Sequence, residues 1–270
     1  MDSAGVPVGH LRRLWLYLLA GLIMLFLMAP TLIVVPMSFS GSDFLQFPPR
    51  TWSTRWYGAY ADSLEWRSAT WISLQAAIST VLLATPLGTA AAYGLNATRS
   101  RLAGAVLVAL TTPMVVPVIF VAIGAFYLYA RLGLLNSVTG LVLAHSTLAM
   151  PFVVALVAAG LKGHDPQLER AARSLGASRA RAFFSVTLPQ IRFSVMSAAL
   201  LAFLTSFDEV VVALLVAGSE NATITRRMFT MLRDQIDPSI AAISSLMIGL
   251  SMALGLLLQA LRAARPRGRR

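Results

Sequence analysis

Two adjacent carboxylates, Asp208 and Glu209, interrupt a run of residues from 193 to 217 that is otherwise free of charge. A carboxylate in an apolar segment needs a cation or a hydrogen-bond donor, because it costs about 2.5–3.5 kcal/mol at the centre of a membrane. Successive residues of a helix point about 100° apart, so the two side chains cannot fully share one face. The pair therefore predicts either a site on a cation path or a hydrogen-bonded contact between packed helices.

The sequence does not supply the further groups that a catalytic or metal site needs. His145 stands in an apolar stretch with no second ligand at metal-binding spacing, so we expect it to be buried and hydrogen-bonded. We expect His164, which flanks that stretch, to be solvated. The chain has no cysteine, and it lacks the H-E-x-x-H, G-x-S-x-G and G-x-x-x-x-G-K motifs. These features favour a transporter subunit that does not itself bind ATP over an intramembrane enzyme.

The elements that position these residues follow from the composition. The chain has 270 residues, of which 57% are hydrophobic and 12% are charged, with a mean hydropathy of +0.73. A soluble domain carries about 25% charged residues, so the sequence predicts an all-α membrane protein. A membrane-spanning helix needs about 20 apolar residues, and six runs are long enough. They are residues 14–37, 70–97, 104–130, 138–160, 193–217 and 239–261.

The third run is the most broken of the six. Its sequence TTPMVVPVIF, residues 111–120, contains Pro113 and Pro117. Each proline removes a backbone donor and tends to kink a helix. We treat residues 14–261 as one six-span domain, between an N-terminal tail at 1–13 and a basic tail at 262–270.

The basic residues indicate how the spans are oriented. With both termini in the cytoplasm, 15 of the 22 basic residues fall on the cytoplasmic side. The opposite side then holds Arg50, Arg55, Arg67, Arg131, Arg226, Arg227 and Arg233. Inner loops of membrane proteins carry an excess of Lys and Arg. This distribution accounts for the net charge of +11 without a nucleic-acid partner.

The longest inner connection, residues 161–192, begins with a well-marked short helix. Asp165 and Pro166 suit its N-cap and first position, and Gly176 suits its end, where a left-handed backbone is needed. The spacing i, i+3, i+4, i+7 predicts one apolar face rich in small residues. That face consists of Leu168, Ala171, Ala172 and Leu175.

The remainder of the connection predicts a second short helix. Ser178 can cap this helix, which we expect to run to Val186, and Pro189 to close it before the fifth span. The first helix can dock in a groove of a partner protein, or it can lie on the lipid surface. A passive channel would need no organised docking loop, so the loop favours a driven transporter.

The stretch LERAARSLGASRARAFFSVTLP, residues 168–189, resembles the EAA loop of binding-protein-dependent ABC importer permeases. That motif reads E-A-A, three residues, G, nine residues and I-x-L-P. The matching positions are Ala171, Ala172, Gly176, Val186, Leu188 and Pro189. Arg170 occupies the glutamate position, and Glu169 lies one residue earlier. A shift of one residue turns a helical side chain by about 100°.

The resemblance extends over nearly the whole chain. AHSTLAMPFVV at 144–154 and SFDEVVVALLVAG at 206–218 are similar to the second permease subunit of spermidine/putrescine-type importers. The resemblance implies a six-span type I ABC importer permease in the bacterial plasma (inner) membrane. The 161–192 loop would then be a coupling helix that contacts an ATPase, and Asp208 and Glu209 would line the substrate path.

The resemblance also implies partners and a substrate class. The partners would be an ATP-binding cassette ATPase dimer, a second and different permease subunit, an extracytoplasmic solute-binding protein and the lipid bilayer. ATP and Mg²⁺ would be used by the ATPase, and this chain would bind no cofactor. The expected substrate is a small cationic or amine solute such as putrescine or spermidine. Relatives with similar motifs leave γ-aminobutyrate, an opine, thiamine, an aminophosphonate and iron as alternatives.

Overall fold

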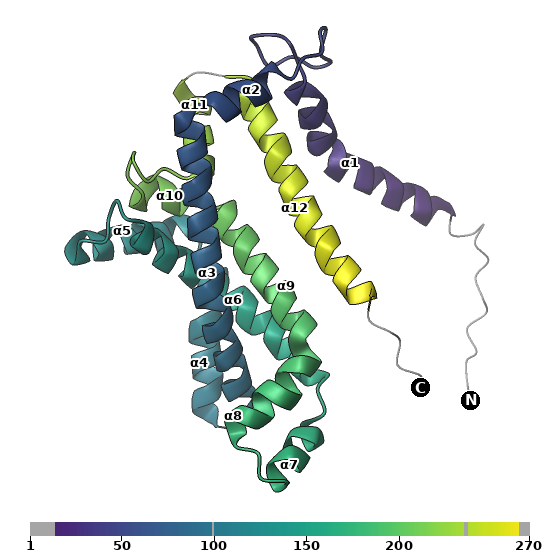
Figure 1. The fold of residues 1–270 in the computed structure, drawn as a ribbon, viewed down its shortest axis with the longest axis vertical. Helices are drawn as coiled ribbons and strands as arrows, with labels where there is room; N and C mark the ends of the chain where they lie inside the picture. Colours follow the sequence, from purple (N-terminus) through teal and green to yellow (C-terminus); the bar gives the residue numbers. More distant parts are fainter. Residues whose placement is uncertain (1–13, 99, 235–236, 265–270) are drawn as a thin grey trace. The chain divides into compact units, whose positions relative to one another are not determined.

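The computed structural model describes residues 14–98, 100–234 and 237–264, which form helices joined by short loops (Figure 1). Within these residues the helices are α1 (Leu14–Ser38), α2 (Arg55–Asp62), α3 (Leu64–Ala97), α4 (Arg101–Thr111), α5 (Val118–Leu132), α6 (Val138–Lys162), α7 (Pro166–Ser174), α8 (Arg179–Ala182), α9 (Leu188–Phe207), α10 (Val211–Val216), α11 (Ile224–Asp234) and α12 (Ser239–Ala263). An isolated antiparallel bridge pairs Ser40 with Trp52. The all-α prediction is therefore confirmed.

In the described part of the chain, five helical segments are long and apolar enough to cross a membrane. They are α1, α3, α6, the stretch Arg179–Phe207 that ends with α9, and α12. The bent pair α4 and α5 makes a sixth span if it is counted as one. The structure therefore has five or six candidate spans, and it agrees with the predicted six when the bent pair is counted as the third span.

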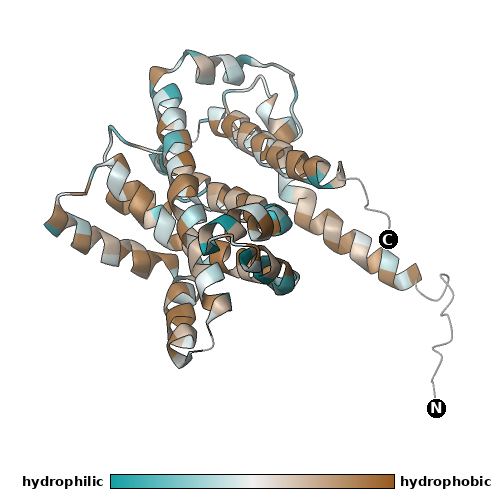
Figure 2. Cartoon of the chain, turned by 60° about the horizontal axis from the view of Figure 1, so that its bottom comes forward, coloured by the Kyte–Doolittle hydropathy of each residue, from teal (hydrophilic) through white to brown (hydrophobic). Residues whose placement is uncertain are grey.

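The chain divides into two compact units. The first contains residues 14–62 and 237–249, with α1, α2 and the start of α12. Across α1, which is described in full, only Ser38 is buried. A helix that is apolar on all sides and exposed in the isolated chain is suited to lipid or to a partner helix. Figure 2 shows hydrophobic residues on the ribbon of α1 along its length.

The second unit, residues 63–234 and 250–264, is built on α3, α6 and α9, which pack against one another. Small residues let these helices approach closely, as is usual in membranes. At Gly88 of α3, an added Cβ would lie 2.5 Å from Cγ1 of Val153 on α6. The buried cluster consists of Ala84, Ala92, Ala149, Val153, Val154, Val157, Leu161, Ile191, Ala198 and Ala202.

We expect Gly88→Ala to destabilise the protein by about 1–3 kcal/mol, because the new methyl group overpacks the contact with Val153. The measurement is thermal unfolding of the purified protein in detergent. Gly94→Ala on the same helix is the control, since a Cβ there meets no atom within 4 Å. The second change Val153→Ala should restore part of the loss. Equal stability of the two glycine variants would contradict the close packing of α3 and α6.

The run 104–130 does not form a straight helix. α4 ends at Thr111, a 3₁₀ turn covers Thr112–Met114, and α5 begins at Val118, with a bend of 100° between the two helical parts. Pro113 lies in the 3₁₀ turn, and Pro117 caps α5 without a donor of its own. Two prolines within five residues remove the hydrogen bonds that would continue α4, which explains the break.

The fifth run also differs from the prediction. Its helical stretch starts at Arg179, earlier than residue 193, and α9 ends at Phe207. Asp208 is therefore the C-cap of α9, with φ −95° and ψ −2°, and α10 begins only at Val211. The predicted span 193–217, with Asp208 and Glu209 inside it, is therefore not one continuous helix. The carboxylate pair lies instead at a break between two helices.

Candidate functional site

The start and end of α7 agree with the sequence. The Asp165 carboxylate accepts a hydrogen bond from the Gln167 N–H at 2.9 Å, and Pro166 is the first helical residue. At the other end Gly176 has φ +91°. The Gly176 N–H bonds the Arg173 carbonyl, and the next N–H bonds the carbonyl of Ala172. This is the double hydrogen bond of a Schellman motif, which needs a left-handed residue at the Gly176 position.

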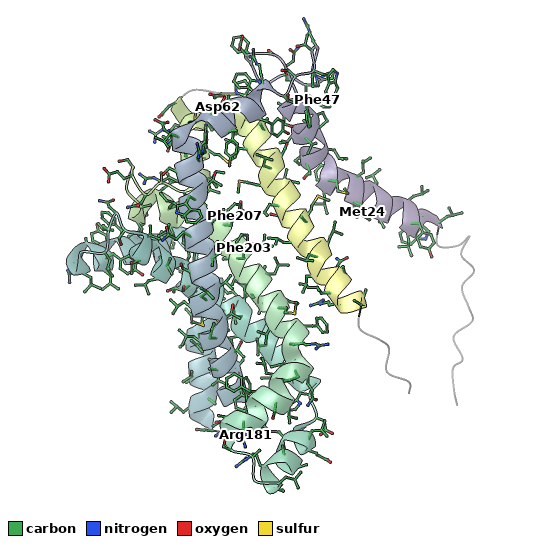
Figure 3. All side chains as sticks on the ribbon, in the orientation of Figure 1. Met24, Phe47, Asp62, Arg181, Phe203 and Phe207 are labelled. Atoms are coloured by element: carbon green, nitrogen blue, oxygen red, sulfur yellow. The ribbon has the colours of Figure 1, made fainter. Side chains whose placement is uncertain are left out.

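One face of α7 is exposed in the isolated chain. Leu168 is 51% exposed and Leu175 is 89% exposed, while Arg170 and Ala171 are also exposed. Ala172 is half-buried. The α7–α8 region lies at one end of the second unit (Figure 1). Figure 2 shows its polar residues, and Figure 3 labels Arg181 there. The helix thus presents leucine and alanine side chains among arginines at an end of this unit.

The second half of the loop differs from the predicted helix. Ser178 caps α8 as expected, but the chain continues through one turn of π-helix, Phe183–Thr187, directly into α9. The Leu188 N–H bonds the Phe183 carbonyl, five residues back. Pro189 sits in the first turn of α9 and does not close a helix there. Pro189 has no N–H and cannot donate the regular hydrogen bond of an α-helix, which is compatible with a widened turn beside it.

Glu169 points into the protein and joins three segments. Its side chain is 14% exposed. The Tyr93 hydroxyl of α3 donates to Oε1 at 2.5 Å, and the Thr187 hydroxyl of the π turn donates to Oε2 at 2.6 Å. His164 Nε2 lies 4.0 Å from Oε2. Neither Tyr93 nor Thr187 carries a sequence signal for this role, because each lies in a largely apolar stretch.

The surroundings of Glu169 favour its charged form. Burial by itself would raise the pKa of Glu169, but the two hydrogen bonds and the nearby basic side chains hold the pKa below its ordinary value. The carboxylate is therefore ionised at neutral pH. The expectation that His164 is solvated is wrong, because its side chain is only 4% exposed and its Nδ1 lies 3.1 Å from Oε1 of Gln190.

The two carboxylates of the acidic pair, Asp208 and Glu209, have different environments. Glu209 Oε1 accepts a hydrogen bond from the Val212 N–H at 3.0 Å, which caps the start of α10. The Glu209 carbonyl accepts from the Thr225 hydroxyl at 2.9 Å. Asp208 is exposed, and its carboxylate has no hydrogen bond or ion pair to the described residues. Asp208 is thus the carboxylate that is free to meet a cation.

Both carboxylates line a cavity of about 420 Å³. Its other described lining residues are uncharged and come from the turn between α4 and α5, the first residue of α5, and from α6 and α9. They are Pro113, Met114, Val116, Val118, Leu148, Phe152, Leu204 and Thr205. The break between α9 and α10 and the break between α4 and α5 therefore open onto the same space. Figure 3 labels Phe203 and Phe207 of α9, whose rings stack with centroids 5.4 Å apart.

The arginines closest in sequence to α10 bind other groups of the protein. The Arg226 guanidinium donates to the carbonyls of Ala217 and Gly218, and Arg227 forms an ion pair with Glu65 of α3. Neither arginine lines the cavity beside Asp208. His145 is fully buried and its Nδ1 lies 2.7 Å from the Ser206 hydroxyl, which confirms the prediction of a buried, hydrogen-bonded histidine.

Comparison with known proteins gives a consistent result. Residues 84–267 match the family described as binding-protein-dependent transport system inner membrane component. The chain is 32% identical over 235 residues to the putrescine transport system permease protein PotI of Escherichia coli K12, covering 83% of this chain and 82% of that protein. It is 29% identical over 229 residues to the spermidine/putrescine transport system permease protein PotC of the same strain, covering 85% and 86%.

Solved structures share the fold. A chain of a bacterial ABC transporter involved in the import of the acidic polysaccharide alginate superposes with a TM-score of 0.74 at 15% identity. The match covers 94% of this chain and 97% of that chain. A chain of an amino acid ABC transporter has a TM-score of 0.60 at 16% identity, covering 78% and 98%. At these identities the likeness bears on the fold alone.

Proposed function

Since the chain belongs to the family of binding-protein-dependent transport system inner membrane components, we propose that it conducts a small organic cation and couples this import to a separate ATPase. The chain is a permease subunit of an ABC importer in the inner membrane and is not itself an enzyme. Its own task is to form part of the path and to connect that path with the energy source.

The cavity beside Asp208 carries the cation proposal. An uncompensated carboxylate attracts an ammonium group, and it acts strongly where apolar walls exclude water. The uncharged lining, with Leu148, Phe152 and Leu204, offers apolar surface for the methylene chain of an alkylamine. This combination supports an aliphatic amine better than an anionic solute.

The names of the relatives support putrescine as the probe. PotI is named for putrescine and PotC for spermidine and putrescine. γ-Aminobutyrate, an opine, thiamine, an aminophosphonate and iron are the alternative solutes of this proposal. Of these, the free carboxylate of Asp208 favours the solutes that carry a positive charge.

We propose α7 as the contact with the ATPase. Its exposed face combines Arg170, Ala171 and Leu175, and leucine exposed to 89% on a helix with a fixed end calls for a partner surface. The proposed coupling set also includes Gly176, which ends α7, and Val186, Leu188 and Pro189, which lie in the π turn and the first turn of α9. The partners of this proposal are an ATPase dimer that uses ATP and Mg²⁺, a second and different permease, and an extracytoplasmic solute-binding protein. The chain itself is proposed to bind no cofactor.

The orientation belongs to the same proposal. An ATPase that uses cellular ATP requires α7 to lie in the cytoplasm, and an even number of spans then puts both termini there. The excess of basic residues in the 161–192 loop and the 262–270 tail supports that orientation.

Uptake in cells tests the function directly. We expect cells with the complete system to accumulate labelled putrescine, and the same cells without this chain to lose that uptake. Competition by unlabelled spermidine, and not by γ-aminobutyrate, thiamine or an aminophosphonate, would establish a polyamine importer. Loss of uptake of a different solute on deletion would contradict the substrate, and an unchanged uptake profile would contradict the transport role.

A further inference from the structure

Glu169 is the point at which α7 is joined to the membrane-spanning helices. Its two carboxylate oxygens bind different segments: Oε1 takes the Tyr93 hydroxyl near the end of α3, and Oε2 takes the Thr187 hydroxyl just before α9. Thr187 is fully buried and the Glu169 side chain is 14% exposed, so this joint is largely shielded from solvent. An ionised acceptor makes hydrogen bonds that are shorter and stronger than those of neutral groups.

A second layer of contacts supports the joint. His164, two residues after the end of α6, lies beside the Glu169 carboxylate and beside the Gln190 side chain of α9. The Tyr93 ring packs on Phe183 of the π turn, with centroids 4.8 Å apart. The ends of α3, α6 and α9 therefore meet α7 at one carboxylate.

The neighbouring residue has a different environment. Arg170 is exposed, with no side-chain hydrogen bond to the described residues, while Glu169 is largely buried. Adjacent helical residues point about 100° apart, so the side chain that faces inward cannot also lie on the exposed face. Arg170 is therefore available to contact the partner, whereas Glu169 contacts the chain's own spans.

We propose that Glu169 is a positioning residue that transmits displacement of α7 to α3 and α9, and that it does not contact the ATPase. The inference rests on the proposed function of α7. α9 ends at Phe207 and Asp208 is its C-cap, so a movement passed to α9 reaches the cavity and its free carboxylate. The π turn at Phe183–Thr187 is a break in regular hydrogen bonding at which α9 can move relative to α8.

The test uses conservative variants in the complete transporter reconstituted in proteoliposomes. Glu169→Gln keeps the shape and removes the charge, while Tyr93→Phe and Thr187→Val each remove one donor. We measure putrescine imported per ATP hydrolysed, and also the dependence of ATP hydrolysis on the binding protein. We expect each variant to lower the amount of putrescine imported per ATP about threefold. ATP hydrolysis should also become less dependent on the binding protein, while the amount of assembled complex stays unchanged.

A double variant tests whether Glu169 and Tyr93 act through the same hydrogen bond. The double variant Glu169→Gln with Tyr93→Phe should be no worse than the poorer single variant, because both remove the same link. Ser185→Ala is the matched control, since its hydroxyl bonds the Arg181 carbonyl within its own turn. Tyr127→Phe controls for loss of a tyrosine hydroxyl, as this side chain is 67% exposed.

Three outcomes would overturn the proposal. Loss of copurifying ATPase in Glu169→Gln, with Tyr93→Phe and Thr187→Val normal, would make Glu169 an ATPase contact. Wild-type coupling in all three variants would make the cluster merely structural. A wild-type complex without any ATPase would contradict the proposed function itself and this inference with it. If the wild type hydrolyses ATP on addition of binding protein but imports no putrescine, only the substrate is wrong, and the hydrolysis measurement still decides the role of Glu169.

Discussion

Replacing Gly176 by valine is expected to lower solute import per ATP at least tenfold while the protein still inserts and assembles. The residue holds φ +91° at the end of α7, where an L-amino acid pays about 1–2 kcal/mol and a β-branched one pays more. Space is not the obstacle, because a Cβ at Gly176 meets no atom within 4 Å. A penalty of this size reduces the population of the native turn about tenfold, but it is small against a total stability of about 5–15 kcal/mol. The measurement compares uptake with ATP hydrolysis in proteoliposomes.

Two further glycine variants separate backbone conformation from side-chain bulk. Gly176→Asn should recover most of the coupling, since asparagine tolerates the left-handed region. Gly163→Ala lies in the same loop at φ −91°, with the nearest atom 3.7 Å from an added Cβ, and should leave coupling unchanged. Wild-type coupling in Gly176→Val would rule out the idea that the shape of this turn carries the ATPase signal.

The variant Asp208→Asn is expected to reduce putrescine uptake at least tenfold with normal assembly. Asp208 lines the cavity with a carboxylate that has no described partner, so its charge is available to a cation. A tenfold change corresponds to about 1.4 kcal/mol, which is in the range of one charge-assisted hydrogen bond. Initial rates against putrescine concentration give the measurement, and we expect the loss to appear mainly as a higher KM.

Glu209 provides the comparison within the same site. Glu209→Gln retains an oxygen for the Val212 N–H, whereas Glu209→Ala loses the cap and should cost about 1 kcal/mol of stability. Glu220→Gln removes an exposed carboxylate that does not line the Asp208 cavity, and we expect unchanged uptake. If Asp208→Asn transports normally while Glu209→Ala fails to assemble, the pair has a structural role and the cation path lies elsewhere.

Local signals in the sequence were sufficient for much of the fold. Apolar length predicts the spans because the bilayer demands about 20 apolar residues whatever the packing. The Asp165 cap, the first-turn Pro166 and the left-handed Gly176 were all predicted, since caps and turns depend on residues within a few positions of each other. Two prolines in TTPMVVPVIF likewise marked the break between α4 and α5.

The contacts of Glu169 could not be predicted in this way. Its partner Tyr93 is 76 residues away in sequence, and a single tyrosine near the end of an apolar run has no pattern that marks it as a donor. The same holds for His164, which the sequence placed in water and the packing of α6 against α9 buries. Long-range polar pairs of this kind depend on the register of one helix against another.

The sequence by itself determined that this is a multi-span helical membrane protein with an organised inner loop, because composition, apolar length and capping residues act locally. Only the tertiary structure decided that α9 stops at Phe207, that Glu209 caps α10 while Asp208 stays free, and that Glu169 faces inward and Arg170 outward. The physical reason is that a buried carboxylate takes whichever donors the packed helices bring within reach. The donors of Glu169 come from segments 76 and 18 residues away in the chain.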